Sequence, residues 1–302
     1  MSDVTLAAPA AVKEETPFRR FVSEFMASKI AVGGLVVFTI IALLAIFAPW
    51  IAPQNPYDLA QLDIMDGRLE PGAVGGGGMV HWLGTDDQGR DMLSAIMYGA
   101  RVSLLVGFAA VIFSTLVGVT VGLLAGYLGG KVDALLMRIA DIQLSFPSVL
   151  IALFLMSAFG TGVEKVLIAL TSVGWVVYAR TVRGSTLREK GREYVQAARV
   201  SGLPDAKIIL RHILPNVLTP LIVIATIQVG TFVLIEASLS FLGVGVPITE
   251  PSLGLLIKNG FDVLFSGLWW ISVFPGLFIM LIVFGINLLG DFLRDELNPR
   301  LK

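Results

Sequence analysis

Few side chains in this sequence can do chemistry, and those that can gather in two polar segments. The first contains Asp86, Arg90 and Asp91, with His81 shortly before them. Carboxylates beside a histidine and an arginine could bind a cation or carry out acid–base catalysis. Threonine and aspartate are also common helix caps, so Thr85 or Asp86 is expected to cap a short helix running into the next apolar stretch. We prefer this capped, solvated helix start to an ion or catalytic site.

The second polar segment is basic and covers residues 184–216. Residues 193–202 are typical of a short helix that ends at Gly202. Asp205 is a candidate cap for a second, amphipathic helix over 206–214. Two short helices of this kind could dock a partner protein. A basic surface segment lying against anionic lipid remains an equally good interpretation of the residues alone.

Composition narrows the chemistry further. The 302 residues include no cysteine and two histidines, His81 and His212, and the net charge is −1. Cysteine-ligated zinc, thiol catalysis and a basic surface for nucleic acid are therefore not expected. Hydrophobic residues make up 55% of the chain, charged residues 15%, and the mean hydropathy is +0.82. A single soluble core cannot bury that much apolar surface, so the sequence predicts a multi-pass membrane protein.

Uncharged runs locate the membrane spans, since a helix needs about 20 apolar residues to cross the hydrocarbon. Five runs are long enough: 30–57, 102–130, 142–163, 212–235 and 263–290. A shorter run at 166–179 is a sixth candidate. Counting it places all lysines and arginines except five (Arg68, Arg90, Arg101, Lys165 and Lys258) on the side of the N-terminus. That distribution obeys the positive-inside rule, so we expect six spans with both termini cytoplasmic, in a bacterial inner membrane.

Small residues recur every four positions in the second span, which predicts a close approach of another helix along one stripe. The stripe consists of Ala110, Ser114, Gly118, Gly122, Gly126 and Gly130. In the third span, Pro147 removes a backbone hydrogen bond and is expected to produce a kink.

The fifth span carries polar residues at its middle. Gln228 and Thr231 share one helix face, with Ile235 one turn later. They are candidate pore-lining residues, and a polar bond between helices is the alternative. Glu236 lies nearer the outer end, where its carboxylate is expected to reach water.

Several of these segments resemble one family. Gln196, Ala197, Ala198 and Gly202, followed by His212 and Pro215, resemble the Glu-Ala-Ala loop of binding-protein-dependent ABC importer permeases. Other blocks are similar to its dipeptide/oligopeptide branch: Gly84, Thr85, Asp86, Gly89, Arg90 and Asp91; residues 99–104; residues 239–243 with Pro251 and Ser252; and residues 290–295.

The resemblance implies an all-α integral membrane protein with six transmembrane helices and the type I ABC importer (MetI-like) permease fold. It divides the chain into a cytoplasmic tail (1–29), a first transmembrane helix (30–52), a periplasmic loop with a short helix (53–100) and a permease core (101–302). The core contains a cytoplasmic coupling loop (184–215) and a periplasmic segment (239–262). Glu193, Gln196, Ala197, Ala198, Gly202, His212 and Pro215 would form the ATPase contact, in which both alanines permit close approach.

The resemblance also implies partners. The chain would be half of a channel that imports di- or oligopeptides by alternating access, paired with a homologous but different permease. Two ATP-binding subunits would hold ATP and Mg, a periplasmic substrate-binding protein would dock outside, and lipid would surround the spans. No cofactor, metal or catalytic residue is expected on this chain, which has no G-x-x-x-x-G-K-[ST] phosphate-binding motif.

Three departures from the family pattern stand out. Gln196 replaces the usual glutamate, so an ion pair there becomes at best a hydrogen bond; Leu253 replaces tryptophan and Asn298 replaces aspartate. Other solutes handled by similar permeases are opines, glutathione-like compounds and nickel, of which nickel is disfavoured by the scarcity of histidine and cysteine. An ion-coupled secondary transporter is a remote alternative, because inverted repeats with interrupted helices are not visible. An intramembrane enzyme is still more remote, since the spans contain Ser and Thr but none holds a His–Asp or paired-Asp set.

Overall fold

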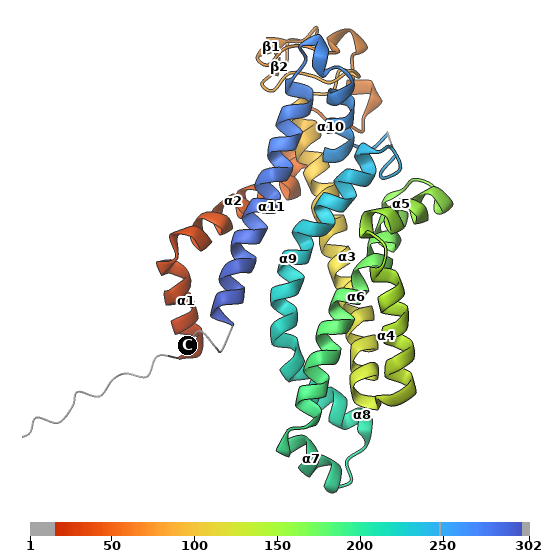
Figure 1. Cartoon of the computed structure of the whole chain (residues 1–302). Helices are drawn as coiled ribbons and strands as arrows, with labels where there is room; N and C mark the ends of the chain where they lie inside the picture. The colour runs from red at the N-terminus through yellow and green to blue at the C-terminus, as the bar shows by residue number, and fades with distance from the viewer. Residues whose placement is uncertain (1–15, 248, 298–302) are drawn as a thin grey trace, which may run out of the picture.

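The computed structural model describes residues 16–247 and 249–297 of the chain, which form a helical bundle with a small cap of loops at one end (Figure 1). The long helices are α2 (Lys29–Ile51), α3 (Met92–Leu128), α6 (Val163–Lys190), α9 (Leu214–Phe241) and α11 (Trp270–Glu296). Shorter helices are α1 (Pro17–Ala27), α4 (Gly130–Leu144), α5 (Ser148–Phe159), α7 (Glu193–Val200), α8 (Asp205–Ile208) and α10 (Leu253–Asp262). A π-helical turn, η3 (Ile209–Ile213), joins α8 to α9.

The cap, residues 53–91, lies at the upper end of Figure 1 and has little regular structure. It contains two 3₁₀ turns, η1 (Leu59–Gln61) and η2 (Ile64–Asp66), and a two-stranded antiparallel ribbon of β1 (Ala73–Val74) and β2 (Val80–His81). A third 3₁₀ turn, η4 (Leu264–Ser266), joins α10 to α11. The expected short helix ahead of the second span is absent from these residues, because α3 itself begins at Met92 and runs without a break for about 55 Å.

The described residues provide five helices long and apolar enough to cross a membrane, and α4 with α5 makes a sixth when the bent pair is taken as one span. The prediction of six spans for a multi-pass membrane protein is therefore supported. The weak candidate at 166–179 lies within α6, a helix of 28 residues. Likewise, the predicted 206–214 helix is not separate from the fifth span, because α8, η3 and α9 follow one another without a loop.

The third span differs from its prediction. Instead of starting at residue 142, helix begins at Gly130 and passes through Lys131 and Arg138. It breaks at residues 145–147 and bends by 89° into α5. Pro147 stands at this break, as the absence of its backbone N–H would suggest.

Helix α4 packs on α6 through polar side chains, which explains why a charged stretch is helical here. Arg183 Nε and Nη2 donate to the two carboxylate oxygens of Asp133 at 2.5 and 2.7 Å, and Arg180 pairs with Asp141. Trp175 Nε1 donates to Gln143 Oε1 at 3.0 Å. The bidentate pair fixes the two helices in one register.

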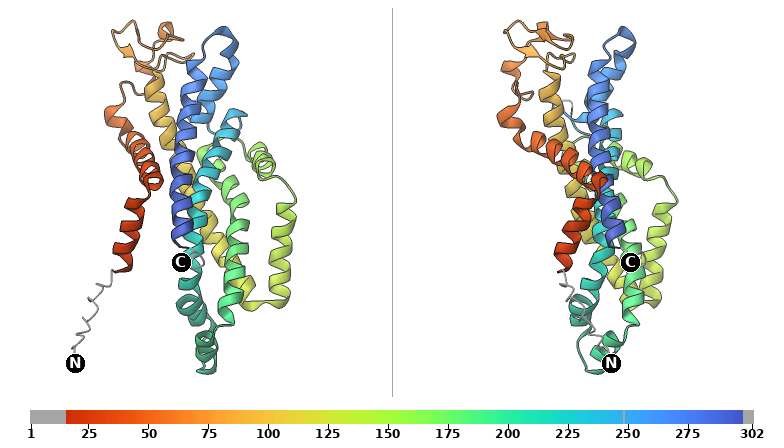
Figure 2. Two further views of the ribbon diagram at one scale, coloured as in Figure 1. Left: turned by 60° about the vertical axis from the view of Figure 1, so that its left-hand side comes forward. Right: turned by 90° about the vertical axis from the view of Figure 1, so that its left-hand side faces the viewer.

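The stripe of small residues on α3 faces α6, as predicted. A Cβ added at Gly122 would lie 2.6 Å from Val182 Cβ, and one at Gly126 would lie 2.7 Å from Thr186 Cβ. Only hydrogen fits at these positions, so α3 and α6 approach closely along much of their length (Figure 2). Gly130 is outside the stripe, because α3 ends at Leu128.

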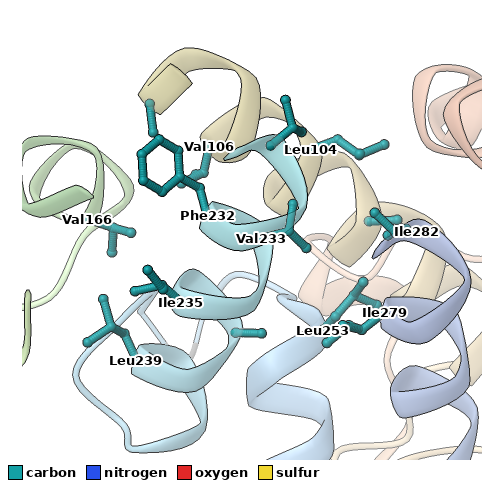
Figure 3. Packing of buried hydrophobic residues seen from close by; sticks show 14 of the residues in the cluster. Leu104, Val106, Val166, Phe232, Val233, Ile235, Leu239, Leu253, Ile279 and Ile282 are labelled. Atoms are coloured by element: carbon teal, nitrogen blue, oxygen red, sulfur yellow. The ribbon is translucent and has the colours of Figure 1, made fainter. Parts of the chain in front are cut away.

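The main hydrophobic core occupies the upper half of the bundle, where α9 lies between α3, α10 and α11. Figure 3 shows Phe232, Val233 and Leu239 of α9 pointing toward neighbouring helices within this core. A second buried cluster at the lower end joins Tyr127 and Tyr178 to the segment around α7 and α8. Asn298 and the first fifteen residues of the predicted tail lie outside the described residues.

Candidate functional site

The predicted coupling segment, residues 184–215, extends beyond the lower ends of the long helices (Figures 1 and 2). It begins in the last turns of α6, passes through α7 and α8, and ends where α9 begins. Gly202 ends the α7 turn with φ +73°, a left-handed conformation that favours glycine. The segment therefore connects two spanning helices through a short exposed helix.

Side chains of α6, α7 and α8 gather around Tyr127 at the end of α3. The Tyr127 hydroxyl of α3 donates to Asp205, and Lys190 Nζ donates to the Tyr127 carbonyl at 2.5 Å. The Arg199 guanidinium lies 5.6 Å from the Tyr127 ring centroid, within the range of a cation–π interaction. The prediction that Asp205 caps a helix is wrong, because its carboxylate accepts from Tyr127 and makes no capping bond.

Tyr194 fastens α7 to the ends of α6 and α9. Its hydroxyl donates to Glu189 and accepts from Asn216 Nδ2 at 3.1 Å. Burial and the neighbouring Glu189 raise the pKa of Tyr194 to about 12. The phenol therefore stays protonated and keeps its hydrogen bond at neutral pH.

Gln196 uses a property that glutamate lacks. Its Nε2 donates to the Lys190 carbonyl oxygen at 2.9 Å and ties α7 back to the end of α6. A carboxylate could not donate this bond. Glutamine at this position therefore makes a hydrogen bond within the chain that the family's usual glutamate could not make. It also presents a neutral side chain to a partner in place of a charged one.

Most of the predicted contact residues lie on the surface, but one alanine does not. Glu193, Gln196, Ala197, Gly202 and Pro215 are exposed, and His212 is half-buried. Val200, the last residue of α7, is 89% exposed. Ala198 is only 7% exposed and packs in the lower cluster, so it supports α7 from beneath instead of lying on the exposed face as expected.

The candidate pore residues on α9 differ from one another in exposure. Thr231 is exposed, Gln228 is half-buried, and Ile235 is 7% exposed within the main core. An open apolar groove of about 470 Å³ between α9 and α11 is lined by residues that include Asn287 and Leu234, the latter about one helical turn after Thr231. Thr231 therefore lies on a face of α9 that is open in the isolated chain, whereas Ile235 packs in the main core.

In the cap, the glycines and Thr85 of the second family motif are structural. Gly84 and Gly89 have φ of +78° and +73°, and a Cβ at Gly84 would lie 2.6 Å from the Leu69 carbonyl oxygen. Thr85 Oγ1 accepts from Leu69 N at 2.7 Å and donates to the Asp66 carbonyl at 2.6 Å. These contacts fold the cap around the start of α3.

Asp91, and not Thr85 or Asp86, caps α3. Its Oδ2 accepts from Ser94 N at 2.8 Å, and its Oδ1 lies 3.2 Å from His81 Nδ1. Gln54 Oε1 accepts from Asp91 N at 2.7 Å. Thr85, Asp86 and Asp91 are buried rather than solvated as expected. In the two described ranges, no group of three His, Cys, Asp or Glu side chains could hold a metal ion.

Asp86 shapes the turn that precedes α3. Its Oδ1 accepts from the backbone N–H groups of Gln88 and Arg90, each at 2.9 Å. Burial raises the pKa of Asp86 to about 6. The carboxyl is therefore a structural group whose charge state changes in mildly acidic solution.

Sequence reasoning missed Tyr127 and Tyr194, which position α7. Their signal is weak, since a tyrosine at the end of an apolar run is also typical of a membrane interface. It also placed the Glu236 carboxylate in water, whereas this side chain is completely buried between α9 and α3. One of its two polar partners, Ser103 of α3, lies 133 positions away in sequence, so the burial of Glu236 leaves no local signal.

Residues 118–302 match the family described as "Binding-protein-dependent transport system inner membrane component". Residues 16–71 match the "N-terminal TM domain of oligopeptide transport permease C". The first match contains the whole coupling segment and the second contains α1, α2 and part of the cap.

Curated relatives extend over nearly the whole chain. The dipeptide transport system permease protein DppC of Escherichia coli is 44% identical over all of both chains. The di/tripeptide permease of Pseudomonas aeruginosa is 38% identical, covering 100% of this chain and 96% of its own, and the oligopeptide permease OppC of Bacillus subtilis is 38% identical, covering 92% and 88%. A solved structure of the inward-facing MetNI methionine ABC transporter is 21% identical with a TM-score of 0.55, covering 68% of this chain and 97% of that chain. The last similarity bears on the fold alone and agrees with the expected type I architecture.

Proposed function

This chain belongs to the family of binding-protein-dependent transport system inner membrane components, and we propose that it is the permease subunit of an ATP-driven importer of di- or oligopeptides. The names of relatives at 37–44% identity support the peptide substrate. The observation that carries the proposal is the exposed α7, which hydrogen bonds tie to the ends of α6 and α9 and a cation–π contact joins to the end of α3. A short helix fixed in this way can pass movement of a bound partner to several spanning helices at once.

The partner at α7 is an ATP-binding subunit. Gln196, Ala197 and Val200 present a small, partly apolar surface on which a groove of another protein could close. The chain has no phosphate-binding motif of its own, so two such subunits supply ATP and Mg. In this role the chain is a non-catalytic channel subunit.

A second, homologous permease completes the channel. Thr231 and the apolar groove between α9 and α11 are open in the single chain and face this partner or the solute path. A soluble substrate-binding protein delivers the peptide at the cap end. The lower end is then cytoplasmic, the cap is periplasmic, and the helices cross a bacterial inner membrane with lipid around them.

Transport follows alternating access. ATP binding closes the ATP-binding subunits and moves the two coupling segments, and the spanning helices rock so that the channel opens toward the loaded binding protein. Hydrolysis returns the helices to the first state. This works only if the coupling segment contacts the two states of the ATP-binding subunits differently, because a ligand with equal affinity shifts no equilibrium.

Purification from the native membrane followed by reconstitution tests the proposal. We expect two ATP-binding subunits and a second permease to co-purify with the chain in mild detergent. We further expect the complex in liposomes to take up dipeptide only with ATP and the binding protein. A chain that purifies alone and transports solute without ATP would contradict the proposal.

A further inference from the structure

Glu236 is a buried carboxyl group in a membrane-spanning helix. It lies in α9, five residues before the helix ends, and its side chain is completely buried. Within residues 16–247 and 249–297, no ion pair includes it. An acidic side chain in such a place is costly unless hydrogen bonds satisfy its oxygens, and it is a reason to search for a role.

Two serines from different positions satisfy the two oxygens. Ser103 of α3 donates its hydroxyl to Glu236 Oε2 at 2.6 Å, and Ser240, one turn along α9, donates to Oε1 at 2.8 Å. Both serines are buried. The bond to Ser103 is a side-chain link across the packed α3–α9 interface.

Ser240 extends this link beyond α9. Its Oγ accepts from Val246 N at 3.3 Å, within the turn of residues 242–247 that contains the left-handed Gly243. The Gly245 carbonyl accepts from Gly162 N at 3.0 Å, directly before α6. One carboxyl group therefore stands at the meeting point of α3, α9, the 242–247 turn and the start of α6.

We propose that Glu236 is a positioning residue that joins the upper ends of α3 and α9 by hydrogen bonds and not by charge, and that this junction must change when the upper end opens during transport. A cluster required only for stability would be served as well by apolar side chains, which cost nothing to bury. The hydroxyl bonds instead specify one arrangement of α3 and the 242–247 turn, and they can be exchanged for other partners in a second arrangement. The inference rests on the proposed alternating-access function.

Uptake per ATP hydrolysed in the reconstituted complex tests this role. Glu236→Gln keeps the size of the side chain and its ability to hydrogen-bond, so its coupling ratio is expected within about 2-fold of the original. Glu236→Met keeps the approximate size but removes the bonds, and its ratio is expected to fall about 10-fold, the scale of one buried hydrogen bond. Ser238→Ala is the matched control, since this exposed serine of α9 bonds only to the Leu234 carbonyl.

Ser103→Ala removes only the hydrogen bond between α3 and Glu236. It provides a second test in case the Glu236→Met variant does not fold. We expect a coupling ratio between those of the Gln and Met variants. An unchanged ratio in folded Met and Ser103→Ala variants would overturn the proposal. A Gln variant as defective as the Met variant would also overturn it, because charge would then be required.

A second readout separates this inference from the peptide assignment. The chain has no cysteine, so Leu104→Cys provides a single reporter beside Ser103, at a position that is 7% exposed. In the resting complex a water-soluble maleimide should label this cysteine about 10-fold faster with Glu236→Met than with Glu236→Gln or Glu236 itself. The labelling experiment requires no peptide. If dipeptide uptake failed while labelling was as expected, only the assignment of a peptide substrate would be refuted. Equal labelling in all three would refute the junction.

Discussion

At the lower end of the bundle, Tyr194 and Gln196 hold α7 by hydrogen bonds while its other face stays open to solvent. At the upper end, Asp91 and Glu236 make comparable numbers of hydrogen bonds but are completely buried. The same long helices, α3 and α9, contribute to both ends. The polar groups at the lower end hold an exposed surface in place, whereas those at the upper end fix how the chain's own helices pack against one another.

Substitutions at the two ends should therefore have different effects. Removal of a buried polar partner leaves an unsatisfied group and lowers the stability of the chain. A change to an exposed face leaves the fold intact and acts on whatever binds there.

Asp91→Ala should have the largest effect. It removes the cap of α3 and leaves His81 and Ser94 without their buried partner, so we expect a loss of about 3–5 kcal/mol in unfolding free energy. Asp133→Ala breaks a partly exposed pair with Arg183 and should cost about 1 kcal/mol or less. Denaturant unfolding of the purified chain in detergent measures both, and equal losses would contradict the contrast between buried and exposed pairs.

Ala197→Trp should act on the partner rather than on the fold. The bulky ring prevents close approach at α7, and we expect affinity for the ATP-binding subunit to fall about 100-fold, a typical hot-spot effect. Quantitative co-purification measures the loss. Ala60→Trp, an exposed alanine in the cap, is the control and should keep the subunit bound. Retention by Ala197→Trp would place the contact elsewhere.

Asp86→Asn tests the cap through its pH dependence. The pKa of Asp86 in the folded chain, about 6, lies above its ordinary value of 3.8, so folding favours the protonated form. The stabilising contribution of the protonated form is fully present below 3.8 and is lost as pH rises through about 6. Asparagine avoids the buried charge and should stabilise the cap by about 1–2 kcal/mol at pH 7, with the difference vanishing toward pH 4. Amide hydrogen exchange of residues 84–91, compared between the two proteins at each pH, measures this; a pH-independent difference would argue against it.

Gln196→Glu should have the smallest effect. A carboxylate cannot donate to the Lys190 carbonyl, so we expect a loss of about 1 kcal/mol in the local stability of α7. Faster amide exchange confined to residues 193–200 would show it. Gln88→Glu, at a half-buried position of the cap, provides the corresponding change at the upper end and should leave exchange in α7 unaltered.

Apolar runs and charge distribution were sufficient to predict a six-span helical membrane protein, and the spacing of small residues on α3 correctly predicted close helix packing. The boundaries were less predictable. Lys131, Arg138 and Asp133 interrupt hydropathy at the start of α4, yet this stretch is helical, and Asp133 is paired with Arg183 on α6. Such pairing depends on residues 50 positions away and leaves no local signal.

The exposure of individual site residues could likewise be predicted only where it depends on local sequence. Gln196, Ala197 and Gly202 could be placed on the surface from their pattern, because an exposed loop needs only local information. The burial of Ala198, Asp86 and Glu236 depends on helices distant in sequence, such as the contact between Ser103 and Glu236 across 133 positions. The local sequence pattern therefore distinguishes polar from apolar segments, but it does not show whether a given side chain in a polar segment is exposed or buried.

Cross-linking from single cysteines at the two ends asks directly whether the ATP-binding subunit sits at α7, since the chain contains no cysteine of its own. Val200 is 89% exposed at the lower end, and Phe265, in η4 at the upper end, is 97% exposed and serves as its match. With a short bifunctional reagent in native membranes, Val200→Cys is predicted to give an adduct with an ATP-binding subunit and Phe265→Cys is not. An adduct of position 265 with an ATP-binding subunit, or no such adduct from a reactive position 200, would contradict the assignment of the coupling segment.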